Sequence, residues 1–97
     1  MCGAPKQGGT LAGIDLSTQT VIQGQVWHDG APVAGAYVRL LDGTDEFTAE
    51  VVTSPEGEFR FFAAPGTWKV RSLAAVGKGE RVLEAEVGLN ETTIVIS

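Results

Sequence analysis

The sequence predicts an all-β protein, a seven-stranded β-sandwich that follows a flexible N-terminal arm. Three observations predict this class. Apolar and polar residues alternate over short runs, glycine and proline turns separate these runs roughly every 8 to 12 residues, and no segment carries a sustained helical stripe. Strands of this length can bury their inward side chains between two packed antiparallel sheets, and an open barrel is the alternative.

The flexible arm is expected over residues 1–18 and the β-sandwich domain over residues 19–97. The first range holds four glycines and one proline, and neither the strand period nor the helical period persists through it. A chain of 97 residues has the length of a single domain. The two ranges therefore describe one domain with a terminal extension.

The first three strands are expected at residues 20–28, 36–41 and 47–53. In each of them apolar residues recur at every second position, which places them on one face of a strand. These positions are Ile22, Gly24 and Val26 in the first strand, Val38 and Leu40 in the second, and Phe47, Ala49 and Val51 in the third. Between the first two strands, residues 29–32 are expected to form a turn, because glycine reaches positive φ and proline donates no hydrogen bond.

Four more strands complete the domain. One contains Phe59 and Phe61, the next follows a Pro65-Gly66 turn, and the last two are expected at residues 81–87 and 92–96. The side chains expected to form the core are Val26, Val38, Leu40, Phe59, Phe61, Trp68 and Val70.

Charge and composition exclude several classes of partner. Twelve acidic residues outweigh seven scattered basic ones, giving a net charge of −5, which argues against nucleic-acid binding. No apolar run approaches the roughly 20 residues of a membrane helix, and the first residues lack a signal-peptide pattern. A single cysteine forms no internal disulfide. We therefore expect a cytoplasmic protein without membrane partner or cofactor, either a monomer or a weak homo-oligomer.

Four segments of the chain resemble one superfamily of small sandwiches. Gly24–Val26 reads Gly-x-Val, Pro32–Leu40 reads Pro-Val-x-Gly-Ala-x-Val-x-Leu, Gly57–Phe61 reads Gly-x-Phe-x-Phe, and Pro65–Val70 reads Pro-Gly-x-Trp-x-Val. This pattern resembles the transthyretin-like or carboxypeptidase-regulatory-like superfamily. The resemblance implies a Greek-key topology. It says little about function, because such sandwiches serve as stalks, accessory domains and binding modules.

A second resemblance includes the arm. The opening Met1–Ala4, the glycine-rich stretch after it, and the segments Arg39–Asp42 and Glu46–Val51 are similar to a small actinobacterial family of unknown function that is often labelled SseC. That label reflects a neighbouring gene for a rhodanese-like thiosulfate sulfurtransferase. The resemblance therefore implies a link to sulfur metabolism and such an enzyme as partner, and it identifies no catalytic residue.

Cys2 carries the most unusual chemistry in the sequence. The initiator Met1 is normally removed in front of a small residue, which would leave a free amine and a thiol on adjacent carbons of Cys2. The ammonium group favours the reactive thiolate, and a glycine-rich arm would expose it. Such a group could accept a sulfane sulfur, bind a soft metal, or form a mixed disulfide. The alternative is that Cys2 is an incidental terminal residue.

His28 and three outward aromatic residues are the remaining candidates. His28 is the single histidine, so a metal site would need Cys2 and the terminal amine beside it, and an exposed turn histidine is the alternative. If the inward residues face the core, then Trp27, Tyr37 and Phe62 face outward, where they would mark an interaction surface if they cluster.

Three functions follow from these features. The first is a non-catalytic accessory or sulfur-acceptor protein that uses Cys2 with a sulfurtransferase. The second is a structural or interaction module that uses the outward aromatic residues. The third is a metal-binding protein that uses the terminal amine, Cys2 and His28.

Overall fold

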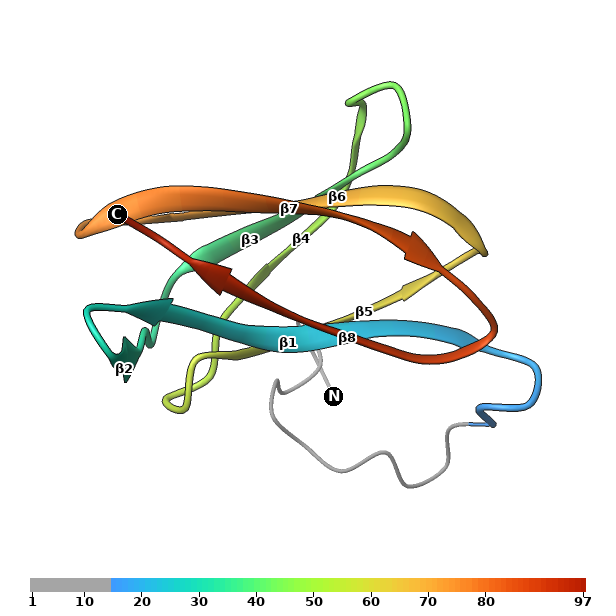
Figure 1. Cartoon of the computed structure of the whole chain (residues 1–97), viewed down its shortest axis with the longest axis horizontal. Coiled ribbons are helices and arrows are strands. Elements are labelled where there is room, and N and C mark those ends of the chain that lie inside the picture. The colour runs from blue at the N-terminus through green and yellow to red at the C-terminus, as the bar shows by residue number, and fades with distance from the viewer. Residues whose placement is uncertain (1–14) are drawn as a thin grey trace, which may run out of the picture.

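The computed structural model describes residues 15–97, and over this range the chain is all β, as the sequence predicts (Figure 1). No helix of the described residues is long and apolar enough to cross a membrane. Eight strands form, namely β1 (Thr20–His28), β2 (Ala31–Pro32), β3 (Tyr37–Leu41), β4 (Phe47–Val52), β5 (Glu58–Ala63), β6 (Gly66–Ala74), β7 (Gly77–Ala85) and β8 (Gly88–Val95).

The strands form two sheets that lie face to face, so the predicted two-layer sandwich is confirmed (Figure 1). In sheet A the central strand is β1, with β5 and the short β2 on one side and β8 on the other. Sheet B has the order β4-β3-β6-β7. The strand pairs of the described residues are antiparallel, as expected, apart from β1 and β8, which run parallel.

The count of eight strands corrects the expected seven. The extra strand is β2, which lies in the segment predicted as a turn and pairs Ala31 with His28 and Pro32 with Trp27. The turn itself is shorter than expected and consists of Asp29 and Gly30, with φ angles of 52° and 79°. Two consecutive residues with positive φ form the tight hairpin turn whose twist matches that of the strands, so the chain pairs again immediately after Gly30.

The predicted core is largely confirmed. Phe59 and Phe61 are buried side by side on β5, with ring centroids 6.0 Å apart and planes tilted by 53°, a favourable arrangement for two aromatic rings. Trp68 packs against the core while remaining half-buried at its end. The buried apolar cluster comprises Ile22, Val26, Ala36, Val38, Leu40, Phe59, Phe61, Val70, Ala85, Ile94 and Ile96.

Phe47 departs from the expectation that it shares the inward face of Ala49 and Val51. Its side chain is 61% exposed. The register between β3 and β4 shifts between Leu40 and Leu41, so that Leu40 pairs with Ala49 whereas Leu41 pairs with Phe47. An extra residue in one strand reverses the side-chain alternation beyond it, which turns Phe47 to the outer face.

Residues 15–19 connect the N-terminal segment to the sandwich. The Asp15 carbonyl accepts hydrogen bonds from the N–H groups of Thr18 (3.2 Å) and Gln19 (2.9 Å), and the Gly88 N–H donates to the Gln19 carbonyl (2.8 Å). The predicted flexible arm over residues 1–18 lies, up to residue 14, outside the described residues. The division into arm and domain therefore stays a prediction, while the chain joins sheet A at a turn fixed by hydrogen bonds.

Two backbone hydrogen bonds connect the sheets along one side of the sandwich. The Ser97 N–H, just after β8 of sheet A, donates to the Lys78 carbonyl of sheet B (3.2 Å), and the Lys78 N–H donates to the Ser97 carbonyl (3.4 Å). The Ile96 N–H donates to the Trp27 carbonyl (2.8 Å) and continues the pairing of β8 with β1 within sheet A. The side between β7 and β8 is thus bridged by main chain. On the opposite side, β4 and β5 are the edge strands of the two sheets.

Gly24 allows the closest backbone approach in sheet A. It lies in β1 opposite Phe59 of β5 and Thr92 of β8. A Cβ atom at Gly24 would lie 1.7 Å from the Thr92 carbonyl oxygen and 3.1 Å from the Phe59 ring. Any side chain at this position would therefore force β1 and β8 apart.

We expect Gly24→Ala to lower the free energy of unfolding by at least about 3 kcal/mol, because a methyl group would overlap backbone that cannot move without breaking strand pairs. Chemical denaturation followed by tryptophan fluorescence measures the change. Gly43→Ala is the matched control, because its Cβ would meet only the Thr67 carbonyl oxygen at 3.8 Å, and we expect it to change stability by less than about 1 kcal/mol. Equal denaturation midpoints for the two variants would contradict this account.

The stability of the turn at Asp15 is expected to depend on pH. The Ser17 hydroxyl and N–H groups donate hydrogen bonds to the Asp15 carboxylate (2.5 and 2.9 Å) and lower the pKa of Asp15 below its ordinary value. Because the folded-state pKa is depressed, the turn is most stable above the ordinary pKa of an aspartate and loses this contribution as pH falls through the folded-state pKa. We expect Ser17→Ala to raise the pKa of Asp15 in an NMR titration more than Thr18→Ala does. A pKa that Ser17→Ala leaves unchanged would show that the hydroxyl bond from Ser17 to Asp15 does not form in solution.

Candidate functional site

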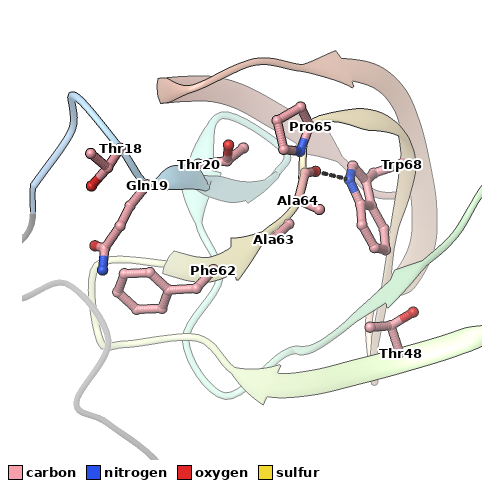
Figure 2. Close-up of a pocket in the computed structure, with 9 residues that line it drawn as sticks. All are labelled: Thr18, Gln19, Thr20, Thr48, Phe62, Ala63, Ala64, Pro65 and Trp68. Atoms are coloured by element: carbon pink, nitrogen blue, oxygen red, sulfur yellow. Dashed lines mark hydrogen bonds between the residues drawn. The ribbon is translucent and has the colours of Figure 1, made fainter.

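A hollow of about 680 Å³ lies at the end of the sandwich where residues 18 and 19 lead into β1. Four elements form it, namely the start of β1 with the residues before it, the beginning of β4, the end of β5 with the turn after it, and the beginning of β6 (Figure 2). We call it the end hollow. Its lining residues are Thr18, Gln19, Thr20, Thr48, Phe62, Ala63, Ala64, Pro65 and Trp68.

Strand alternation explains which side chains build the end hollow. Thr20 and Ala63 are directly paired between β1 and β5, and they share the inward faces of their strands with Ile22 and Phe61. Phe62 lies on the outer face of β5 and is 55% exposed. The indole N–H of Trp68 donates to the Ala64 carbonyl (2.7 Å), as the dashed line in Figure 2 shows. The hollow therefore combines the end of the core with the outer rim of sheet A.

The three aromatic residues expected to face outward do not form one cluster. Phe62 lies beside Val21 at the start of β1, whereas Trp27 lies near the end of β1 on the same face of sheet A. Trp27 is half-buried and its indole N–H donates to the Gln25 side-chain oxygen (3.3 Å). Tyr37 lies on the outer face of sheet B, on the other side of the molecule. Their surroundings therefore differ, and the three side chains do not share one surface.

Tyr37 is the centre of an apolar row across sheet B. It pairs with Val52 of β4 on one side and Leu73 of β6 on the other, and the three side chains are 53%, 47% and 39% exposed. We call these three residues the sheet-B patch. Val52 and Leu73 could not be predicted from the sequence as part of this surface, because only the register of three strands brings them beside Tyr37.

Ion pairs border the sheet-B patch. In the next row of the same face, Arg39 bonds to Glu50 (2.7 Å), and Arg71 bonds to Glu80 (3.2 Å). These two pairs carry no net charge together. The row of the patch itself also holds Lys78, which pairs with Leu73, so the border carries a positive charge besides the two ion pairs.

His28 is tied to the main chain by one ring nitrogen. Its Nδ1 lies 2.9 Å from the Ile96 carbonyl oxygen. A carbonyl only accepts, so Nδ1 carries the hydrogen and Nε2 is the nitrogen able to bind a metal. Within residues 15–97, no group of three or more His, Cys, Asp or Glu side chains could hold a metal ion.

Cys2 lies outside the described residues, so the structure gives no geometry for the expected reactive thiol or for its pairing with His28. The nearest described feature in the sequence is the Asp15 turn. It continues directly into Thr18 and Gln19, which line the end hollow. The segment that carries Cys2 is therefore attached at the hollow end of the sandwich.

Comparison with solved structures supports the fold. The chain resembles a crystal structure of a DUF3823 family protein from Parabacteroides merdae ATCC 43184, with a TM-score of 0.67 and 11% sequence identity. The match covers 82% of this chain and 46% of that protein, so the chain spans about half the length of this neighbour. At this identity the similarity concerns the fold alone.

Comparison with curated sequences shows relatives of matching length. Uncharacterized protein Rv0814c and uncharacterized protein Rv3118 of Mycobacterium tuberculosis (strain ATCC 25618 / H37Rv) are each 54% identical over 100 residues, covering all of both chains. An uncharacterized protein of Mycolicibacterium smegmatis is 53% identical over 88 residues, covering 89% of this chain and 98% of the relative. A family model described as "Protein of unknown function (DUF1416)" matches residues 2–96. The chain therefore belongs to the DUF1416 family.

Proposed function

We propose that this chain is a non-catalytic accessory protein that accepts sulfane sulfur on Cys2 from a rhodanese-like thiosulfate sulfurtransferase in the cytoplasm. The observation that carries the proposal is the extent of the family match, which begins at Cys2 and runs through the sandwich to residue 96. The thiol thus belongs to the unit that the family model describes. The sulfurtransferase and the transthyretin-like Greek-key topology are the parts of the proposal that rest on the sequence resemblances.

The proposed transfer is an exchange between two sulfur–sulfur bonds. The Cys2 thiolate attacks the outer sulfur of a cysteine persulfide on the sulfurtransferase. A new sulfur–sulfur bond forms at Cys2 while the bond in the donor breaks, and the donor cysteine leaves as a thiolate. The transferred sulfur keeps its hydrogen, so the step needs neither an oxidant nor a reductant.

The attachment of the Cys2 segment supports this role. Thirteen peptide steps separate Cys2 from Asp15, where the hydrogen-bonded turn begins. A segment of this length spans at most about 45 Å when extended. That reach suffices for a terminal thiol to enter the active-site cleft of a partner enzyme while the sandwich stays outside.

We expect incubation with a thiosulfate-charged rhodanese-like sulfurtransferase to add one sulfur atom to this chain, because a thiolate beside an ammonium group is a good acceptor. Intact mass spectrometry measures the adduct. Cys2→Ser should abolish it and leave the thermal unfolding midpoint unchanged, because Cys2 precedes the described sandwich. An N-terminal tag that retains residues before Cys2 should weaken it, because the amine is then no longer adjacent to the thiol. An adduct of equal size on Cys2→Ser would contradict the proposal.

A second candidate is an interaction module, and the sheet-B patch is the observation that favours it. Exposed apolar side chains at three adjacent strand positions are a feature of protein contact surfaces. The Arg39–Glu50 and Arg71–Glu80 pairs beside the patch favour a second copy of this chain, because each pair presents both a positive and a negative group to a partner that carries the same arrangement. The small size of the patch points to weak self-association.

For this candidate we expect sedimentation velocity to show concentration-dependent dimerisation that Tyr37→Asp weakens at least about tenfold, because a charge in the centre of the contact would be desolvated. Val95→Asp is the matched control. It introduces the same charge at a 62% exposed valine of sheet A, far from the patch. Similar weakening by both variants, or wild-type protein that remains monomeric at high concentration, would exclude the patch as a self-association surface.

A further inference from the structure

One row of apolar side chains crosses the outer face of sheet A. Val21 of β1 pairs with Phe62 of β5 and with Leu89 of β8, and strand alternation directs all three side chains away from the core. Phe62 and Leu89 are 55% and 39% exposed, whereas Val21 between them is 0% exposed. The outward side chains of a two-layer sandwich are usually polar and solvated. The three residues, which we call the sheet-A row, therefore form a packing surface on the outside of the sandwich.

The turn at Asp15 leads the chain into β1 beside this row. The Thr18 N–H donates to the Asp15 carbonyl (3.2 Å), and a hydrogen bond between the first and fourth residues of a turn reverses the direction of the chain. Leu16, inside the turn, is half-buried, and its carbonyl oxygen would lie 3.6 Å from a Cβ atom on Gly88, the residue before Leu89. A segment that enters such a turn runs alongside the strand that leaves it.

The outer face of sheet A is the side of β1 that is open to such a segment. Thr20, at the start of β1, is paired with Ala63 of β5 on one side and with Gly88 of β8 on the other. The inner face of β1 holds Ile22 and Val26 of the core. Because both pairing edges and the inner face are occupied, a chain that runs back along β1 has to pass over the sheet-A row.

The charge of the outer face also suits the segment of residues 1–14. In the row next to the sheet-A row, the Gln23 amide nitrogen donates to Glu91 (3.3 Å) and the Gln23 amide oxygen accepts from Arg60 (3.2 Å). Glu58 adds a second acid further along the same face. Two carboxylates and one guanidinium make this part of the face negative. Lys6, the one charged side chain of residues 1–14, has the opposite sign.

We propose that residues 11–14 dock on the sheet-A row, with the side chains of Leu11 and Ile14, the branched aliphatic residues of this segment, packed against its three apolar residues. The tether to β1 favours this occupant over a second copy of the chain, because a short linker gives an effective concentration in the millimolar range. Docking confines the flexible arm expected from the sequence to residues 1–10. Nine peptide steps separate Cys2 from Leu11, so the thiol then stays within about 32 Å of the row. The inference is independent of sulfur transfer, because it concerns packing alone.

Methyl NMR on the full-length protein tests the docking directly. We expect nuclear Overhauser cross-peaks from the methyl groups of Leu11 or Ile14 to those of Val21 or Leu89. The backbone order parameters of residues 11–14 should be close to about 0.85, the value of a rigid backbone, instead of below about 0.6. In an equal mixture of isotope-labelled and unlabelled protein, the cross-peaks should arise within one chain. Cross-peaks that connect two chains, or order parameters of a flexible segment, would overturn the proposal.

A matched pair of variants on β8 tests the row as the contact surface. Leu89→Ser removes part of the row at a 39% exposed position, whereas Val95→Ser makes a similar change at a 62% exposed valine at the other end of the same face. Both positions are partly exposed, so we expect folded variants that keep the amide spectrum of the sandwich. Leu89→Ser should lower the order parameters of residues 11–14 below about 0.6, and Val95→Ser should leave them unchanged. Order parameters that remain high in Leu89→Ser, or that fall equally in both variants, would contradict docking on the row.

Discussion

The close contact between β1 and its neighbours is the constraint on which the sandwich depends. β1 pairs with β2, β5 and β8, and Gly24 lets the Thr92 carbonyl approach to a distance that no other residue type permits. The parallel pairing with β8 continues to the bond from Ile96 to Trp27, and the next residue bonds to sheet B. Through this sequence of contacts, the position of β1 determines how one side of the sandwich is closed.

The end hollow depends on the same strand. The pairing of Thr20 with Ala63 defines the last layer of the core, and Trp68 only partly covers that layer. The bond from the Gly88 N–H to the Gln19 carbonyl attaches the preceding turn to the start of β8. The hollow and the attachment point of the Cys2 segment thus occupy one end of the molecule, while the sheet-B patch occupies the outer face of the other sheet.

The local pattern of the sequence predicted the first strands closely, but it began the last two strands four residues too late, at residues 81 and 92 instead of Gly77 and Gly88. It predicted the mutual arrangement of the strands only in part. The bounds of β1 and the burial of Phe59 and Phe61 follow from the two-residue period, which depends on neighbouring residues alone. The outward orientation of the Phe47 side chain follows from a register shift between β3 and β4, and the sequence of one strand alone does not specify such a shift. The parallel β8, the row around Tyr37 and the end hollow likewise need residues far apart in sequence, whereas the prediction of a reactive thiol at Cys2 rests on the sequence alone.

Residue-resolved amide hydrogen exchange on the intact protein tests the central role of β1 most directly. If the contacts of β1 hold the sandwich together, its amides from Ile22 to Val26 open only with global unfolding, and they should exchange most slowly together with those of β8 near Thr92. Amides of the edge strand β4 should exchange faster. Faster exchange in β1 than in β4 would contradict the account.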